Sequence, residues 1–269
     1  MQPTTDQLRE TLRTLYSDDD ALEAVVQRLR APELPRNDVV ADSDVRLKAA
    51  ADVDLQRQAR CGFPEVVFGS GKPPELVVEI LRQQRNAGQE CLVTRVNAAQ
   101  KEAVLSEFPS AVWNSIARTI RINDETDFRS GPVYVVTAGS SDRPVAEEAI
   151  ETLRWMHVDC TLIQDVGVAG PHRLQRHIPR LQQAAVIVCV AGMEAALPSV
   201  LGGYVGCPVI GVPTSVGYGA SLQGMTAMLA MLTCCASNVV AVNIDAGFKG
   251  GYAAGLMASR MPYSRDTPT

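Results

Sequence analysis

The chain has 269 residues, of which 46% are hydrophobic and 20% are charged, and its formal net charge is −5. This length is enough for one large or two medium domains with real cores, and the composition is typical of a soluble globular enzyme. The negative charge and the lack of a lysine-rich or arginine-rich cluster argue against a nucleic-acid partner. We therefore expect a small anionic ligand held by a few local donors.

Residues 1–6 lack the basic start and apolar run of a signal peptide. The most apolar stretch, residues 225–236, is shorter than the roughly 20 residues that a membrane helix needs. We therefore expect a cytoplasmic protein with no membrane partner. The seven scattered cysteines show no C-x-x-C spacing, which favours reduced thiols, and the five-residue spacing of His172 and His177 argues against zinc.

In the first half, residues 5–16 and 19–29 have helical periodicity and predict a helical hairpin. A small α/β module follows. Its predicted elements are strands at 65–68, 91–96, 111–113 and 117–121 and helices at 74–86 and 98–108. Residues 123–127 read as a linker, so we predict one domain over residues 1–128 and a second over 129–269.

Two segments of the first half carry charge near glycine or turns. Acids and arginines alternate over residues 52–65, which by itself indicates a solvated, salt-bridged surface. The segment 69–74, with Gly69, Gly71 and Lys72, could grip a phosphate, but its spacing is not that of a P-loop. A tight strand-to-helix turn explains it equally well.

The second half alternates apolar runs with helix-like segments. The runs are residues 132–137, 158–163, 185–190, 208–212 and 239–242. Near-continuous apolar strands separated by helices predict a parallel sheet covered on both faces. Each run ends in a polar or glycine-rich turn, and these turns are residues 138–143, 165–173, 191–199, 213–219 and 243–248. All should meet at the carboxyl edge of the sheet, where open α/β folds bind ligands.

The first turn, residues 137–142, is the strongest site signal, because it joins an apolar strand to a helix start. Gly139 allows close approach of a ligand, and the first helical N–H groups lack intrahelical partners. In the second turn, Arg173 is suited to a phosphate or carboxylate, whereas His172 is either a proton carrier or a helix cap. We expect a phosphate or carboxylate to bind at the turn formed by residues 137–142.

The third turn places Glu194 in an otherwise apolar loop. A carboxyl among apolar groups tends toward a raised pKa, which suits a general base, although a glutamate facing water is the competing account. Residues 221–236 are apolar nearly all round and predict a buried helix. By the same reasoning Cys234 and Cys235, at its end, would be buried structural cysteines.

Longer motifs match a known family. Residues 131–250 resemble the aminoimidazole ribonucleotide carboxylase/mutase fold, and residues 45–250 are more similar to the LarB family. That family comprises the pyridinium-3,5-biscarboxylic acid mononucleotide synthases of nickel-pincer cofactor biosynthesis. The segments that carry the resemblance are 52–60, 62–72, 137–149, 165–173, 192–194, 213–220, 235–236 and 243–245. Departures from the family pattern are Ser140 for threonine, Ala195 for glycine, Cys234 for serine and Ala246 for asparagine.

The resemblance implies a flavodoxin-like three-layer fold for the second domain, behind the smaller N-terminal α/β module. It also implies carboxylation of the pyridinium ring of nicotinic acid adenine dinucleotide by CO2, with hydrolysis of the phosphoanhydride to release AMP. Cys235 would add to the ring, which makes the neighbouring carbon nucleophilic, and Glu194 would remove a ring proton. Magnesium is expected for the hydrolysis, with unknown ligands.

By the same resemblance, the nicotinate mononucleotide half would be held by residues of the first three turns. These are Gly139, Ser140, Ser141, Asp142, Asp165, Gly167, His172, Arg173, Gly192 and Met193. From their charge, Arg57, Arg60 and Lys72 would grip the AMP half. The resembled fold commonly forms octamers with sites near subunit contacts, so we expect a homo-oligomer.

Two other functions remain open on the sequence. A purine-pathway aminoimidazole ribonucleotide carboxylase/mutase would need neither Cys235 nor the first hundred or so residues. A non-catalytic nucleotide-binding protein would use the same loops without turnover.

Overall fold

A computed structural model describes residues 51–123 and 127–261. The predicted helical hairpin at 5–29 lies outside the described residues, and the domain boundary near residue 128 stays a prediction. Where described, the predicted helices and strands are present with ends that differ by a few residues, except for the helix predicted over 221–236.

The N-terminal module is a four-stranded sheet in the order β1-β2-β4-β3, with β1 and β2 parallel and the other pairs antiparallel. Its strands are β1 Val67–Phe68, β2 Cys91–Thr94, β3 Val112–Asn114 and β4 Thr119–Ile122, and its helices are α4 Arg57–Cys61, α5 Pro74–Asn86 and α6 Ala98–Glu107. Pro74 occupies the first turn of α5, and Asn97 with Gln100 forms a capping box on α6. These local signals explain why both helices begin as predicted.

Strand β2 is buried on both faces, because its side chains alternate between two cores. Cys91 and Val93 pack in the core of the N-terminal module, with α5 and α6. Leu92, between them, packs with the core that contains α7 of the second domain. Strand β2 thus belongs to the sheet of the N-terminal module and also packs, through Leu92, with the core around α7 of the second domain.

The second domain is a five-stranded parallel sheet in the order β6-β5-β7-β8-β9. Its strands are β5 Ser130–Thr137, β6 Val158–Ile163, β7 Val186–Ala191, β8 Val209–Pro213 and β9 Val239–Ala241. This is the flavodoxin-like order, in which the chain reverses its direction of travel between β5 and β7. The fold class predicted from the sequence is confirmed.

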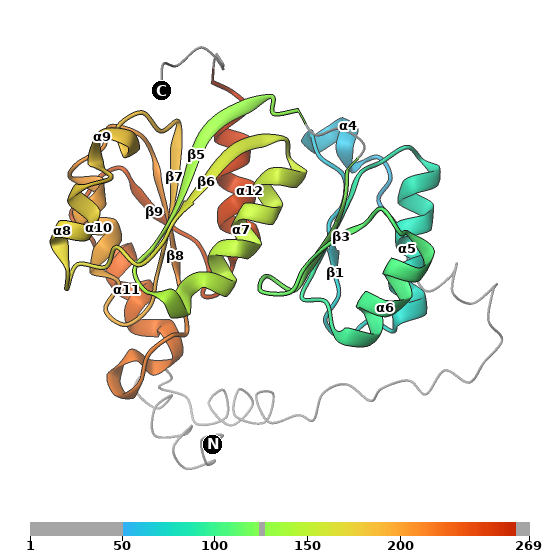
Figure 1. The fold of residues 1–269 in the computed structure, drawn as a ribbon, viewed down its shortest axis with the longest axis horizontal. Helices are drawn as coiled ribbons and strands as arrows, with labels where there is room; N and C mark the ends of the chain where they lie inside the picture. The colour runs from blue at the N-terminus through green and yellow to red at the C-terminus, as the bar shows by residue number, and fades with distance from the viewer. Residues whose placement is uncertain (1–50, 124–126, 262–269) are drawn as a thin grey trace, which may run out of the picture. The chain divides into compact units, whose positions relative to one another are not determined.

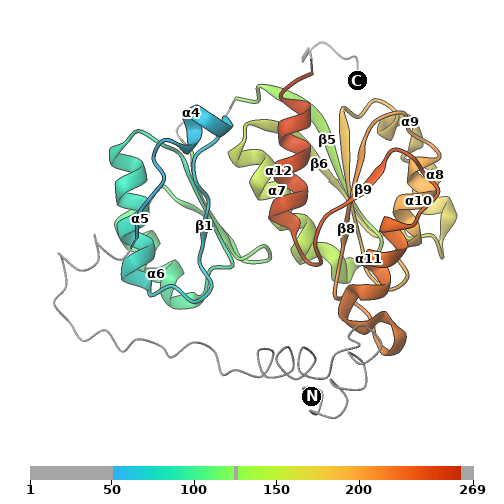
Figure 2. The same cartoon turned by 180° about the vertical axis from the view of Figure 1, so that it is seen from behind.

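Helices cover both faces of this sheet, as Figures 1 and 2 show. The helices are α7 Arg143–Trp155, α8 Pro171–Gln175, α9 Ile178–Leu181, α10 Ala196–Gly202, α11 Met225–Leu232 and α12 Gly247–Ala258. α7 and α12 lie together on one face and bury a core of small, aliphatic and aromatic side chains, while α8, α9 and α10 contribute to the core of the other face. None of the helices in the described ranges is long and apolar enough to cross a membrane.

The prediction of one buried helix over 221–236 is wrong. The segment forms a short 3-10 turn, Gly219–Gly224, followed by α11, and only Ala227 and Met231 of α11 are buried. Four apolar side chains of this segment, which we call the α11 apolar face, are between 41% and 66% exposed: Leu222, Met225, Leu229 and Leu232. The helix has one face on the sheet and another that nothing in the described part of the chain covers.

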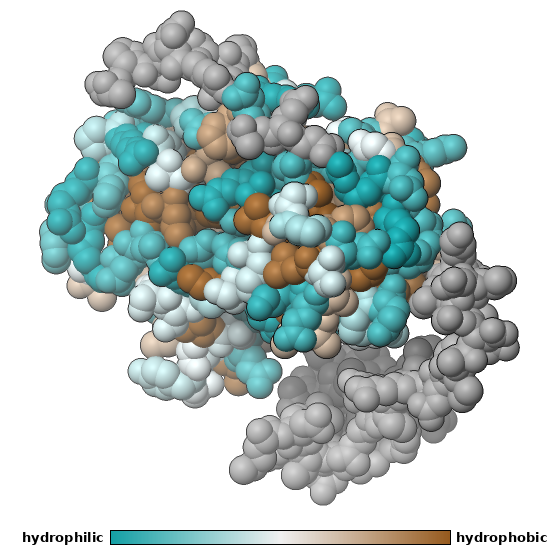
Figure 3. All heavy atoms as spheres, turned by 45° about the vertical axis from the view of Figure 1, so that its right-hand side comes forward, coloured by the Kyte–Doolittle hydropathy of each residue, from teal (hydrophilic) through white to brown (hydrophobic). Residues whose placement is uncertain are grey.

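On the face drawn in Figure 3, hydrophobic residues form patches separated by hydrophilic side chains. Single exposed apolar residues are normal on a protein surface, whereas a row of them along one helix marks a contact surface. The α11 apolar face is of the second kind.

Candidate active site

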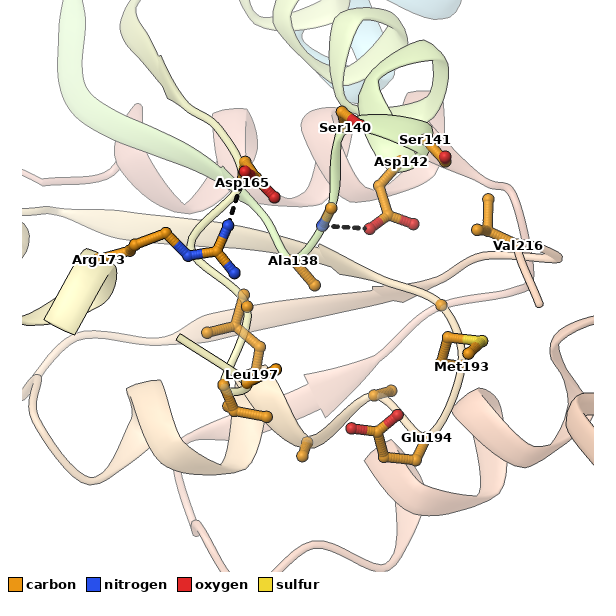
Figure 4. Close-up of a pocket in the computed structure, with 17 residues that line it drawn as sticks. Ala138, Ser140, Ser141, Asp142, Asp165, Arg173, Met193, Glu194, Leu197 and Val216 are labelled. Atoms are coloured by element: carbon orange, nitrogen blue, oxygen red, sulfur yellow. Dashed lines mark hydrogen bonds and ion pairs between the residues drawn. The ribbon is translucent and has the colours of Figure 1, made fainter. Parts of the chain in front are cut away.

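A cavity of about 320 Å³ lies at the carboxyl edge of the parallel sheet, where the loops after β5, β6, β7 and β8 meet (Figure 4). The loops after β5 and β7 flank the point where the strand order reverses, which is the ligand position in open α/β folds. The lining residues are Ala138, Gly139, Ser140, Ser141, Asp142, Asp165, Gly167, Val168, Ala169, Arg173, Gly192, Met193, Glu194, Ala195, Ala196, Leu197 and Val216.

Ten of the residues predicted from the three turns line this cavity, and His172 does not. His172 is exposed on α8, next to Arg173, which faces the cavity. Because adjacent residues of a helix point in different directions, only one of this pair can contribute to the same wall. The structure thus selects the arginine.

Asp142 holds three of the loops together from beneath the cavity. It is 3% exposed, accepts the backbone N–H of Gly139 at 2.9 Å and accepts the Thr214 hydroxyl at 2.7 Å. Burial raises the pKa of Asp142, and the hydrogen bonds from Thr214, Gly139 and the Gly192 backbone oppose that rise. Asp142 therefore acts as a fixed acceptor that ties the loops after β5, β7 and β8.

Thr214 is a residue that the sequence argument did not single out. It is fully buried in the turn after β8, and its backbone N–H also binds the carbonyl of Ala191, the last residue of β7. The sequence feature that could have identified Thr214 is its position directly after an apolar strand, in the motif 213–220. Spacing alone could not show that its hydroxyl reaches a carboxylate 72 positions earlier.

Two glycines let the backbones approach at the cavity floor. A Cβ on Gly167 would lie 2.7 Å from the Ala138 carbonyl oxygen, and one on Gly192 would overlap the Val216 carbonyl oxygen and the Thr214 hydroxyl. Ala195 has a left-handed backbone with φ of 49°. That conformation explains why glycine is usual at this position in the family that the sequence resembles.

The opposite wall carries the charged side chains. Arg173 donates to the Asp165 carboxylate at 2.6 Å, as the dashed line in Figure 4 marks. The Arg173 side chain is 30% exposed, so the guanidinium remains open to a further acceptor. An arginine fork on one side and the helix start at residues 139–142 on the other form a site suited to an anion.

Glu194 stands on the rim of the cavity and is exposed. Of the two accounts that the sequence left open for Glu194, a carboxyl among apolar groups and a glutamate facing water, the single chain shows the second. The neighbours of Glu194 in sequence are apolar, but the loop projects from the edge of the sheet, so water reaches the carboxylate.

The three cations predicted for the AMP half do not line this cavity. Arg60 pairs with Asp54 at 2.5 Å, which lowers the pKa of Asp54 and matches a salt-bridged surface. Lys72 donates to the Phe68 carbonyl at 2.9 Å. Arg57 lies half-buried in α4.

The segment 69–74 is a tight turn. The backbone carbonyls of Gly69 and Lys72 in this turn accept hydrogen bonds from the Gln100 side chain.

Cys235 lies at the other edge of the sheet from the cavity. It precedes β9 by four positions, next to Ala236, which contacts Gly202 at the end of α10. The five residues of β8 separate the two edges by about 15 Å at a strand rise of about 3.3 Å per residue. A thiol at this position does not reach the cavity of its own chain.

The prediction that both adjacent cysteines are buried is also wrong. Cys234 is partly buried, with its sulfur 3.8 Å from the Ala236 carbonyl oxygen, and Cys235 is exposed. The chain leaves α11 at Leu232, so both cysteines follow the helix and neither belongs to its packed face. Of the two, Cys235 is the accessible thiol.

The cavity does not contain a ready metal site. In the described ranges, no three potential ligands of the His, Cys, Asp and Glu types cluster. Asp142 is buried beneath the cavity with its own donors, and Asp165 is engaged by Arg173. The protein side chains here do not fit a magnesium ion that the protein alone would hold.

Comparisons with known proteins cover nearly all of the chain. A model described as the LarB/PurE-like N-terminal domain matches residues 45–125, and the AIR carboxylase model matches residues 132–267. An uncharacterised protein of Methanocaldococcus jannaschii is 36% identical over 267 residues, which is 94% of this chain and 98% of that protein.

Two further comparisons cover part of the chain. The N5-carboxyaminoimidazole ribonucleotide mutase of the same organism is 32% identical over 119 residues, 43% of this chain and 71% of the mutase. A solved PurE2 variant from Treponema denticola is 18% identical, with a TM-score of 0.38, over 48% of this chain and 77% of that chain. With both of its domain models matched in order, the chain belongs to the LarB family, whose domains are those of a carboxylase/mutase-type enzyme.

Proposed function

We propose that this protein carboxylates the pyridinium ring of nicotinic acid adenine dinucleotide with CO2 and cleaves its phosphoanhydride. The products are pyridinium-3,5-biscarboxylic acid mononucleotide and AMP. The observation that carries the proposal is the anion-binding cavity at the switch point of a chain that matches the LarB N-terminal model and the AIR carboxylase model in order. One water enters with the dinucleotide and CO2, and three protons leave when both product phosphates are dianions: one from ring carbon 5 and two from the hydrolysis.

The nicotinate mononucleotide half would lie in the cavity, with its phosphate against the turn at 139–142 and Arg173 on the opposite side. Support comes from the backbone N–H groups of this turn and from the partly exposed guanidinium of Arg173. An arginine that already shares one carboxylate, Asp165, is held in place before the ligand arrives, so less side-chain entropy is lost on binding.

The ring needs a nucleophile before it can react with CO2, because a pyridinium carbon is electrophilic. The Cys235 thiolate would add at carbon 4, which turns the ring into an enamine. In an enamine the nitrogen lone pair pushes electron density onto carbon 5, so carbon 5 becomes nucleophilic. Carbon 5 attacks CO2 and forms the new C–C bond. Loss of the carbon-5 proton to Glu194 and expulsion of the thiolate restore the aromatic ring.

The thiol and the cavity would come from different copies of the chain. Cys235 is exposed, follows the exposed α11 apolar face, and lies at the opposite edge from its own cavity. A second copy docked through the α11 apolar face would present Cys235 to the first copy's cavity and would also cover the exposed Glu194. The proposed homo-oligomer thereby completes the active site.

Anhydride cleavage develops negative charge on the phosphate that leaves. A divalent ion would supply charge neutralisation on the leaving phosphate when it is bound. The described residues offer no cluster of three potential metal ligands, so such an ion would have to be held largely by the phosphates of the substrate. The chain's own contribution would be to hold the phosphates through Arg173 and the turn at 139–142.

The direct test is incubation of the purified protein with the dinucleotide and labelled bicarbonate, with and without magnesium. We expect labelled mononucleotide and AMP in equal amounts. Cys235→Ala should lower both by at least about a thousand-fold, as expected when a covalent nucleophile is lost, whereas Cys234→Ala should react normally. Binding without any turnover of the wild-type protein would contradict the proposal and favour a nucleotide-binding protein.

A second candidate function is a carboxylase/mutase of aminoimidazole ribonucleotide. The 32% identity between the second domain and the N5-carboxyaminoimidazole ribonucleotide mutase favours it. That reaction needs no thiol, so activity toward aminoimidazole ribonucleotide that survives Cys235→Ala would select this alternative.

A further inference from the structure

The fifth turn of the parallel sheet, residues 243–248, does not line the cavity, although it follows β9 in the same way as the four turns before it. It instead meets Arg95 of the N-terminal module. Arg95 follows β2 with a left-handed backbone, φ of 55°, and donates through its guanidinium to the Asp245 carbonyl. A residue outside the second domain thus holds one of its sheet-edge turns.

The same guanidinium binds a buried carboxylate. Arg95 contacts the two Glu148 oxygens at 3.1 and 3.4 Å, and Glu148 lies on α7 with 4% of its side chain exposed. Glu148 also accepts the backbone N–H of Phe248 at 3.1 Å, in the first turn of α12. Burial raises the pKa of Glu148, and Arg95 is the foremost group that opposes this rise. Arg95 therefore has a fixed position.

A continuous set of hydrogen bonds leads from Asp245 to the cavity floor. The Asp245 carboxylate accepts the backbone N–H of Ser215 at 2.8 Å, and the Asp245 N–H binds the Pro213 carbonyl at 2.9 Å. Thr214, between these two anchored residues, donates to Asp142. Asp142 in turn holds the Gly139 backbone, where the first cavity loop begins.

We propose that Arg95 is a positioning residue, through which the N-terminal module sets the turn at 213–215 and so the floor of the cavity. None of the residues that line this cavity comes from the N-terminal module, so Arg95 acts on it only through the turns. The role explains why one arginine contacts both a helix carboxylate and a loop carbonyl. Its effect on catalysis rests on the proposed function, whereas its effect on the turn does not.

The chain contains a matched control. Arg121, on β4 of the same module, also binds a buried carboxylate of α7, donating to Glu151 at 3.1 Å. Its side-chain hydrogen bonds go to Glu151 and Asn123, and none of them leads to the turns at the sheet edge. Arg95→Met and Arg121→Met therefore remove similar inter-module bonds, and only the first removes the link to Asp245.

The first measurement is hydrogen–deuterium exchange of the full chain without substrate, read on peptides that cover 213–217 and 243–248. Arg95→Met should speed exchange in both peptides by about five-fold or more, the factor expected when a hydrogen bond worth about 1 kcal/mol is lost. Arg121→Met should leave them unchanged. Equal changes in the two variants, or no change in either, would overturn the proposal.

The second measurement is kinetic, with the dinucleotide and bicarbonate. Arg95→Met should lower kcat/KM by about ten-fold, mostly through KM, since a displaced floor weakens ligand positioning. Arg95→Lys, which keeps the charge but not the fork, should recover part of the loss. If Arg95→Met does not fold, Arg95→Lys and Arg95→Gln carry the same comparison.

Asp245→Ala tests the route itself, because it removes the acceptor for Ser215 and leaves Arg95 in place. The double variant Arg95→Met/Asp245→Ala should be no more impaired than the worse single variant, and additive losses would contradict a shared route. If exchange responds as expected but the wild-type protein does not turn over the dinucleotide, the positioning role is supported and the proposed function fails.

Discussion

The two edges of the five-stranded sheet differ in what a single chain provides. At the carboxyl edge, the loops are fixed by buried hydrogen bonds through Asp142 and Thr214, and the cavity is formed within one chain. At the amino edge, Cys235 is exposed, and the α11 apolar face is exposed along the segment that leads there from the carboxyl edge; no described residue covers either. On the proposed function, the ligand would therefore bind within one copy, whereas the thiol would come from a second.

The largest expected effect comes from mixing two inactive variants, which tests this division directly. Cys235→Ala lacks the thiol, and Glu194→Gln lacks the proposed base. If each site combines the cavity of one copy with the thiol of another, random co-assembly at equal amounts should restore about a quarter of the sites. Activity after co-refolding and re-assembly measures this, and sites built within one chain would instead stay inactive in the mixture.

The α11 apolar face offers the second test. Leu229→Glu and Leu232→Glu place charges on side chains that are 53% and 61% exposed in the single chain. We expect dissociation of the oligomer and a loss of activity of about 10- to 100-fold, because a buried unpaired charge opposes association. Light scattering and the activity assay report both effects.

The control for these two variants is Val112→Glu, at an apolar residue of β3 that is 46% exposed and far along the chain from α11. It should keep the assembly and the activity of the wild-type protein. Full activity of monomeric Leu229→Glu would show that the site is complete within one chain.

A smaller effect on stability should distinguish a buried threonine hydroxyl that is hydrogen-bonded from one that is not. Thr214→Val removes the donor to buried Asp142 and should cost about 1 to 3 kcal/mol of unfolding free energy and raise KM. Thr119 is also buried, but its hydroxyl has no hydrogen-bond partner among the described residues. Thr119→Val should therefore be neutral or slightly stabilising.

Chemical denaturation and substrate kinetics of the two valine variants provide the measurement. If both variants lose the same stability and neither changes KM, the carboxyl edge is not held by the Asp142 network.

The smallest effect concerns the pH dependence of the fold, away from the cavity. Burial alone would raise the pKa of Glu151, but Arg121, Asn114 and Arg154 lower it below its ordinary value of 4.5. A carboxyl with a lowered folded-state pKa stabilises the fold above its unfolded pKa. That contribution is lost as the pH falls through the folded value.

Glu151→Gln should thus lower the unfolding free energy at pH 7 and flatten its decline below about pH 4.5, measured by urea denaturation. The exposed Glu102→Gln is the control and should leave the pH profile unchanged. An identical profile for Glu151→Gln and the wild-type protein would show that these inter-module ion pairs do not stabilise the fold.

The sequence by itself determined the elements, the parallel sheet and the set of turns at its carboxyl edge. Strand and helix periodicity, Pro74 and the capping residues Asn97 and Gln100 act over a few residues, so they can be read locally. The rule that parallel strands end at one edge then brought residues 139–142, 165–173 and 192–194 to one site without coordinates.

Only the tertiary structure decided which side chains of those turns face one another. The selection of Arg173 over His172 depends on helix rotation, and the Thr214–Asp142 bond joins positions 72 apart in the chain. The exposure of Cys235 and α11 depends on what remains uncovered after every other element has packed. Local sequence fixes backbone conformation, whereas burial and long-range hydrogen bonds are properties of the whole fold.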